Sequence, residues 1–220
     1  MDYTIFNDEL NLIENESIKN FTLEALKIAP KYFFDVPSSV SGKYHPYCNN
    51  GKYGLIMHTK LCVNAGKEIF DNPLLINELA NKPALTKLEE DICISSILIH
   101  DICKYGTNDT IEAGSKSRKD HPILAGEILK NSSSLKNLLD SNIKSTIVKC
   151  VERHTGPWVN DRNGNKILEE PKHYLEKIVH LMDYFGSRKD LMDSSLNRFF
   201  VNNNIPTNSS NINFINANEQ

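Results

Sequence analysis

The sequence predicts an all-α fold with one main domain. Apolar residues recur at helical intervals along most of the 220-residue chain, and no stretch competes as a set of strands. With 40% apolar and 24% charged residues, the chain has the composition of an ordinary globular domain and can bury a core without a disulfide framework. Any metal that it binds is therefore expected to serve chemistry.

Six helices are predicted from these apolar periods. In the first, Ile18, Phe21 and Leu26 fall on one side. Residues 30–54 contain three prolines and several Gly, Ser and Asn residues, which favour a loop. Asp71-Asn72-Pro73 is expected to end the second helix, and Gly106 lies just beyond the end of the third. In order, the predicted helices cover residues 15–28, about 55–70, 88–104, 121–131, 135–153 and 171–190.

Three segments are expected along the chain. Residues 1–42 form an N-terminal helix and loop that pack on the core, and residues 43–200 form the main domain. Residues 201–220 contain eight asparagines and almost no charge, so they offer little apolar surface to bury and are expected to form a mobile tail.

Charge and targeting signals narrow the functional classes. The chain has 25 basic and 28 acidic residues, a net charge of −3, which argues against an architectural DNA-binding protein but leaves a small anionic substrate open. The N-terminus lacks the basic and apolar regions of a signal peptide, and no apolar run could cross a membrane. Five cysteines without a CxxC pair indicate reduced thiols, so we expect a cytoplasmic protein with no membrane partner.

Histidine and aspartate residues mark the candidate site. His100 and Asp101 are adjacent at the end of an apolar helix, in SSILIHDICKYG. Such a pair alone is more typical of a helix-end cap than of a ligand pair. Four further residues lie at or near the ends of predicted helices or on an apolar helix. They are His58 in GLIMHT, His121 in RKDHP, His154 in HTGPW and Asp183 in VHLMDYFGSRK.

The order of these six residues resembles that of the HD-domain superfamily of metal-dependent phosphohydrolases, from about residue 43 to residue 190. HDICK at 100–104 is close to the H-D-x-x-K run of that family. GKYHP at 42–46, GLIMHT at 54–59, HTGPW at 154–158 and VHLMDYFGSRK at 179–189 are similar to a six-ligand subgroup with bacterial and phage-type members. The resemblance implies an HD-domain helical bundle with a metal site in its core.

The resemblance also implies the ligands. A first metal site would use His58, His100, Asp101 and Asp183, with Asp101 bridging to a second ion that His121 and His154 complete. The expected cofactors are two divalent transition-metal ions. Imidazole and carboxylate ligands suit iron, manganese, zinc, cobalt or nickel and do not choose among them.

Phosphoester hydrolysis is the expected reaction, because two such ions can activate a water and stabilise the charge of a displacement at phosphorus. The chain is therefore interpreted as an enzyme that cleaves a phosphoester of a nucleotide or a nucleic-acid end, with Asp101 and Lys104 as catalytic residues. Two alternatives stay open. One is a diiron HD-fold oxygenase that acts on a small polar substrate, and the other is a non-catalytic nucleotide-binding HD protein.

Substrate contacts are expected from residues around these ligands. Lys104 and Arg188 are candidates for binding phosphate oxygens, although charged residues at helix ends are often only solvated. His180 shares a helical face with Asp183 and is either a substrate contact, a group that orients a ligand or a core histidine. Lys43 and His45, in the loop before His58, are further candidates for substrate contacts. Tyr44, Tyr47 and Trp158 are candidates for stacking on a base. His173 is expected on the surface.

The expected partner is a small phosphoester, and single-stranded nucleic acid is a second possibility. A nucleic acid would need a basic track to the pocket, and the local candidates are Lys116, Arg118, Lys119 and Arg153.

Overall fold

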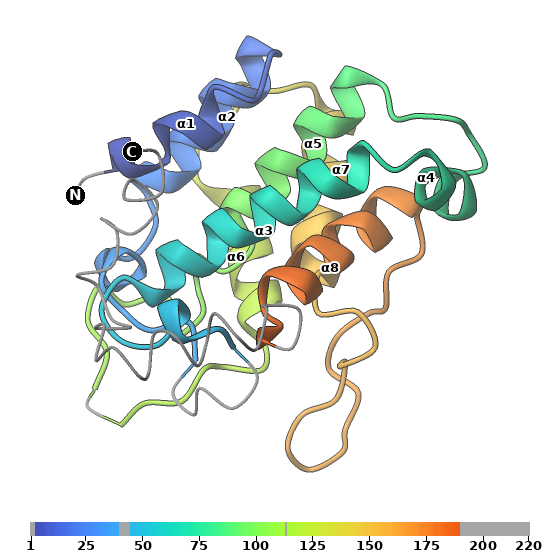
Figure 1. Cartoon of the computed structure of the whole chain (residues 1–220). Coiled ribbons are helices and arrows are strands. Elements are labelled where there is room, and N and C mark those ends of the chain that lie inside the picture. The colour runs from blue at the N-terminus through green and yellow to red at the C-terminus, as the bar shows by residue number, and fades with distance from the viewer. Residues whose placement is uncertain (1–2, 40–44, 113, 190–220) are drawn as a thin grey trace, which may run out of the picture.

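The structure is a computed structural model, and it describes residues 3–39, 45–112 and 114–189. Within these residues it contains eight α-helices and four short 3-10 helices, with no strand beyond one isolated bridge between Asn160 and Lys166. The predicted all-α class is confirmed. The helices are α1 (Asn7–Leu10), α2 (Glu16–Lys27), α3 (Gly54–Phe70), α4 (Pro73–Ala80), α5 (Lys87–Ile99), α6 (His121–Asn131), α7 (Ser141–Arg153) and α8 (Tyr174–Gly186) (Figure 1).

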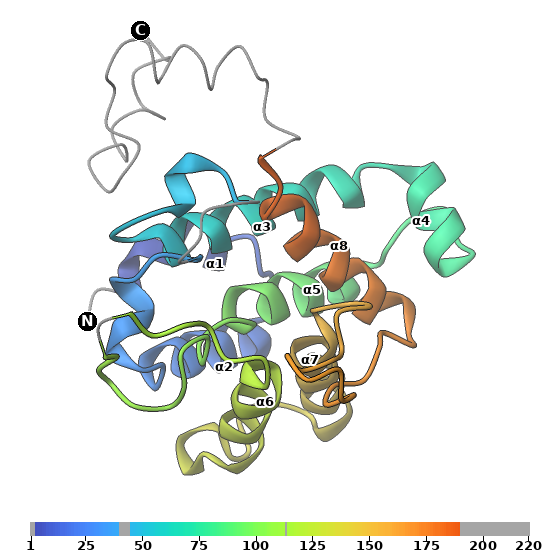
Figure 2. The same ribbon diagram turned by 90° about the horizontal axis from the view of Figure 1, so that it is seen from below.

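Helix α5 is the centre of the bundle. It packs against α3 and α8 on one side and against α2 and α7 on the other, while α6 packs on α7 (Figure 2). Every residue from Asp91 to Ile99 is buried, so this helix is enclosed on all sides. A capping box starts it: the Thr86 hydroxyl accepts from the N–H of Glu89, and the Glu89 carboxylate accepts from the N–H of Thr86.

The predicted and observed helices differ mainly at their ends. Asn72 and Pro73 do end α3, but they also start α4, because the Asn72 side chain caps the N–H of Leu75 and proline is favoured in a first turn. Helix α7 begins at Ser141 and not at residue 135, because the carboxylate of Asp140 accepts from the N–H groups of Asn142 and Ile143.

The third predicted helix extends to residue 104, whereas α5 ends at Ile99 and residues 100–105 form turns. The His100 side chain folds back so that its Nδ1 lies 2.6 Å from the carbonyl oxygen of Ile97. A continuing helix would offer that same oxygen to the N–H of Asp101. The early end of α5 therefore places His100 and Asp101 in a buried turn at the end of the central helix.

The segment before α3 packs on this bundle. Phe6, Phe21 and Phe33 are fully buried in the main core. The buried carboxylate of Asp91 accepts hydrogen bonds from the backbone N–H groups of Glu14 and Asn15, which fixes the segment to α5. The division at residues 42 and 200 stays a prediction, and residues 201–220 lie outside the described part. No helix among the described residues has the length and apolar character needed to span a membrane.

Candidate metal centre

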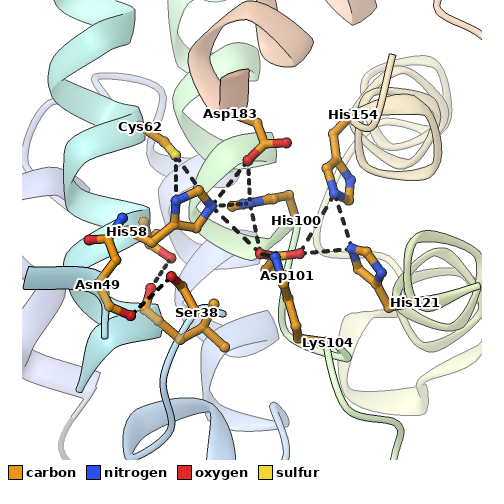
Figure 3. Close-up of polar contacts among 12 residues, drawn as sticks. Ser38, Asn49, His58, Cys62, His100, Asp101, Lys104, His121, His154 and Asp183 are labelled. Atoms are coloured by element: carbon orange, nitrogen blue, oxygen red, sulfur yellow. Dashed lines mark hydrogen bonds and ion pairs between the residues drawn. The ribbon is translucent and has the colours of Figure 1, made fainter. Parts of the chain in front are cut away.

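The six predicted ligands lie close together in the core, although they belong to five helices or to the residues that directly follow them. His58 lies in the second turn of α3, and Asp183 lies in the last turn of α8. His100 and His154 are the residues that directly follow α5 and α7, and His121 is the first residue of α6. Figure 3 shows Asp101 between two groups of these side chains. All of the histidines in the two groups are buried.

The first group consists of His58, His100 and Asp183. The Nε2 atoms of the two histidines are 3.3 Å apart, and Oδ1 of Asp183 lies 3.1 Å from His58 Nε2 and 3.7 Å from His100 Nε2. Oδ2 of Asp101 faces the same group, at 3.3 Å from His100 and 3.6 Å from His58. These four residues are the predicted first metal site.

The second group consists of His121 and His154. Their Nε2 atoms are 3.2 Å apart. The other carboxylate oxygen of Asp101, Oδ1, faces this pair at 2.9 Å from His121 Nε2 and 3.6 Å from His154 Nε2. The two oxygens of one carboxylate are thus divided between the two groups, which is the arrangement that a bridging ligand requires.

Backbone carbonyls orient three of the four histidines. In each, Nδ1 lies within hydrogen-bond distance of the carbonyl oxygen three residues earlier: His100 at 2.6 Å from Ile97, His121 at 2.5 Å from Arg118 and His154 at 2.7 Å from Val151. A carbonyl oxygen can only accept, so each Nδ1 carries a proton and donates it. This leaves Nε2 as the nitrogen available to a metal, with the ring held in place.

The second group fits a cation. If each ring carries its single proton on Nδ1, the Nε2 atoms of His121 and His154 are both acceptors, as is the buried Asp101 Oδ1, which accepts no hydrogen bond from the described residues. Three acceptors that face one another without a hydrogen between them repel, and a positive ion at their centre removes that repulsion. Two imidazoles and a carboxylate suit a divalent transition metal.

The pKa values of the buried histidines and aspartates also fit a metal centre. Burial would lower the pKa of His100, but the carboxylates of Asp101 and Asp183 outweigh it and raise that pKa to about 10. Burial lowers the pKa of His154 to about 3 and lowers that of His58. Burial opposes ionisation of the two aspartates, but neighbouring side chains outweigh it. His100 and Lys104 hold the pKa of Asp101 well below its usual range. His100 and His58 do the same for the pKa of Asp183. A metal would displace the proton on His100.

Cys62 joins the first group, a role that the sequence does not predict, because the five cysteines are interpreted there only as reduced thiols. Its Sγ lies 3.6 Å from both ring nitrogens of His58, and it could serve as a ligand together with His58, His100 and Asp183. The signal in the sequence was its position four residues after His58 on the same helix. Gly186 leaves room for it, because a Cβ there would lie 2.5 Å from the sulfur.

A pocket of about 500 Å³ opens over the two groups. Of the predicted substrate contacts, His45, Lys104, Trp158 and Arg188 line it. The ammonium of Lys104 pairs with Asp101 Oδ2. Burial would lower the pKa of Lys104, but the carboxylates of Asp101 and Asp183 outweigh it and raise that pKa. Lys43 lies outside the described residues. These roles stay predictions.

His180 lies beneath the HTGPW turn, and it is not among the residues that line the pocket. Its Nδ1 is 2.9 Å from the carbonyl oxygen of the predicted ligand His154. His45 lies beside His58 of the first group. Its Nδ1 lies 3.1 Å from Ser38 Oγ, its ring centroid lies 5.5 Å from that of His58, and burial lowers its pKa to about 3.

Two further residues differ from expectation. Arg153, considered for a basic track, donates from Nη1 to both carboxylate oxygens of the buried Glu176, at 2.8 and 2.9 Å. It therefore ties α7 to α8. Tyr184 lines the pocket beside Trp158 but was not singled out from the sequence, because the adjacent Asp183 explained its segment. His173 is exposed as expected and caps α8.

Comparison with known proteins supports the family expectation. A family model described as HD domain matches residues 73–187, which is 187 − 73 + 1 = 115 of the 220 residues. The match contains five of the six predicted ligands, while His58 precedes it. Searches of curated proteins and of solved structures find no match.

Proposed function

Since this chain belongs to the HD domain family, whose members are mostly metal-dependent phosphohydrolases, we propose that it hydrolyses a phosphoester of a nucleotide or a nucleic-acid end. The reaction would use a metal-activated water at a dinuclear site. The observation that carries this proposal is the division of the Asp101 carboxylate between two groups of histidines, at 3.3 Å from His100 and 2.9 Å from His121.

His58, His100, Asp101 and Asp183 would hold one ion, and Asp101, His121 and His154 would hold the other. When bound, two divalent ions lower the pKa of a water, hold a phosphate oxygen and stabilise the charge that develops during displacement. The chain contributes ligand orientation, because the carbonyl contacts of three histidines prevent their rings from turning.

Lys104 supplies positive charge from the chain itself. Its side chain is only 13% exposed and pairs with Asp101 Oδ2, so its ammonium is held at the floor of the pocket. A phosphate oxygen that enters from the pocket would meet this ammonium next to the ligands. Lys104 is therefore placed to orient a phosphoester and to offset its charge in a site that excludes much of the solvent.

The test is hydrolysis of a panel of phosphoesters by the purified chain loaded with manganese or iron, in air and without oxygen. Wild type is expected to release phosphate in both atmospheres. Asp101→Asn is expected to lose more than about 100-fold in kcat, since even residues that only support ligands cost about 10- to 100-fold. Asp109→Asn, an exposed partner of Lys31, is the matched control and should retain activity.

Hydrolysis at an undiminished rate by Asp101→Asn would contradict the proposal. Substrate loss that requires oxygen and consumes it would instead assign the centre to oxidation. A wild-type protein that binds both metals but hydrolyses none of the panel would favour a non-catalytic binding protein.

A further inference from the structure

We propose that Trp158 is the stacking platform for the base of a mononucleotide, whose phosphate lies at the metal centre. This assignment of the substrate class rests on the phosphohydrolase function proposed above. It concerns the wall of the pocket, formed by Trp158, Tyr184 and Arg188, and not its floor. It requires an aromatic surface that is exposed, held in place and close to the ligands.

The wall is an exposed aromatic surface. Trp158 is 49% exposed, although an indole is among the side chains with most to gain from burial. Its ring is parallel to that of Tyr184, with an interplanar angle of 7° and centroids 5.8 Å apart. The guanidinium carbon of Arg188 lies 4.2 Å from the Tyr184 centroid and 5.7 Å from that of Trp158. These three pocket-lining residues bring together an exposed indole, a second ring parallel to it and a cation over both rings.

Backbone and ring contacts hold the wall in place in spite of its exposure. The N–H of Trp158 lies 3.4 Å from the carbonyl oxygen of Thr155, and Gly156 turns the chain with φ of +65°. The His180 ring supports this turn from below, at 5.7 Å from the Trp158 ring between centroids. A side chain that is fixed before a ligand arrives loses little entropy on binding, which is a property of recognition surfaces.

The wall is also tied to the metal centre through the chain. Trp158 follows the ligand His154 by four residues, and Tyr184 directly follows the ligand Asp183. All four line the same pocket. One end of the pocket therefore presents the ligands and Lys104, which suit a phosphate, while a wall presents an aromatic surface, which suits a flat π-system. A nucleoside phosphate combines these two chemistries in one molecule.

The size and polarity of the pocket agree with this class. A volume of about 500 Å³ is far larger than a phosphate needs and lies within the range of small-molecule sites. Thr155 Oγ1 is buried in a pocket-lining residue and has no hydrogen-bond partner in the described structure. A hydroxyl or phosphate oxygen of the ligand could satisfy it.

A mononucleotide is favoured over a longer strand. An adjoining depression of about 390 Å³ shares Arg118 and Lys119 with the pocket. However, the guanidinium of Arg118 pairs with Asp120 at 2.6 and 2.9 Å, and Asp161 lies on the same rim. The two carboxylates offset half of the charge of the four basic residues that line this depression, Lys116, Arg118, Lys119 and Arg162, and so reduce the positive charge that successive phosphates of a strand would need.

The chain offers a direct probe, because Trp158 is its single tryptophan. The full-length protein is titrated in the presence of a chelator, so that no phosphoester is hydrolysed, and indole emission is excited at the red edge of its band, where adenine does not absorb. Adenosine monophosphate and adenosine are expected to quench the emission saturably. Ribose 5-phosphate, which lacks the base, is expected to leave it unchanged. Tyr184→Leu retains Trp158 and should weaken the quenching.

Steady-state kinetics of the metal-loaded protein provide the second readout. Trp158→Leu is expected to raise KM for adenosine monophosphate by roughly 5- to 150-fold, the equivalent of about 1–3 kcal/mol of base stacking. Its KM for ribose 5-phosphate should not change. Ile167→Ala removes another exposed apolar side chain of the same loop and should change neither value.

Three results would overturn the platform: no quenching by the nucleotide, equal quenching by ribose 5-phosphate, or an unchanged KM in Trp158→Leu. Tighter, steeply salt-dependent quenching by a short single-stranded oligonucleotide would replace the mononucleotide with a strand end. If no phosphoester is hydrolysed but the nucleotide still quenches, the proposed hydrolysis fails while the base site stands.

Discussion

Replacement of Gly156 by alanine should destabilise the protein through two separate effects. The residue has φ of +65°, a left-handed conformation that costs a residue with a Cβ about 1–2 kcal/mol. The added Cβ would also lie 2.2 Å from Cε1 and 2.4 Å from Nε2 of His180. Overpacking of this kind typically costs about 1–3 kcal/mol. The expected loss in the free energy of unfolding is therefore about 2–5 kcal/mol.

The contact with His180 can be isolated by a double-mutant cycle. The ring is not free to move away, because its Nδ1 is 2.9 Å from the carbonyl oxygen of His154. In Gly156→Ala combined with His180→Ala, the left-handed conformation stays costly but the steric conflict disappears. The loss in the free energy of unfolding of the double variant should therefore be about 1–3 kcal/mol smaller than the sum of the losses of the two single variants.

The assay is urea-induced unfolding of wild type, both single variants and the double variant, with a chelator present in every sample. Tryptophan emission reports on the turn in the same experiment, because Trp158 is two residues away. Single-variant effects that add within about 0.5 kcal/mol would show that the turn and the ring are energetically independent, and this would refute the reasoning.

Two further changes test how α5 is held. Burial would raise the pKa of Glu89, but hydrogen bonds from Lys82, Tyr174 and Thr86 outweigh it and lower the pKa from 4.5 to about 2. Its stabilisation is therefore complete above pH 4.5 and is lost as the pH falls toward 2, so Glu89→Gln should cost up to about 3 kcal/mol near neutral pH and almost nothing at pH 2 in unfolding experiments. Asp91→Ala leaves the N–H groups of two residues without their acceptor and should cost about 3 kcal/mol or more, whereas the neighbouring Glu90→Ala should cost less than about 1 kcal/mol. A pH-independent effect of the first change, or equal effects of Asp91→Ala and Glu90→Ala, would contradict these assignments.

Much of the candidate centre could be predicted because its residues carry strong local signals. A histidine and an aspartate at the end of an apolar helix are costly unless they have a partner. Four more potential ligands then occur at helix ends or on an apolar helix. The structure brings all six together, and their assignment as ligands stays a prediction.

Other features depend on packing that a single sequence does not reveal. Cys62 shares α3 with His58, but it joins Asp183 of α8 because α3 and α8 approach closely at Gly186. Tyr184 forms a wall only because the turn from α7 brings Trp158 parallel to it. Arg153 suggested a nucleic-acid track, yet it pairs with a buried glutamate that lies 23 residues later. In each case the decisive partner comes from another segment of the fold.

The predicted helix ends are wrong where a side chain competes with the backbone. The apolar pattern continues through Ile102 and Cys103, which are both fully buried, and this favoured a helix up to residue 104. The His100 ring contacts the Ile97 carbonyl oxygen, and the helix has already ended. Periodicity records burial, whereas the end of a helix depends on hydrogen bonds that burial does not determine.

Metal content tests the central claim most directly. The protein is purified without chelator and without nickel affinity resin, and elemental mass spectrometry is compared for wild type, His121→Ala combined with His154→Ala, and His173→Ala as the matched surface control. The account expects about two transition-metal ions per chain in wild type and in His173→Ala, and about one in the double variant. About one ion in wild type, or a double variant that retains two, would contradict the dinuclear centre.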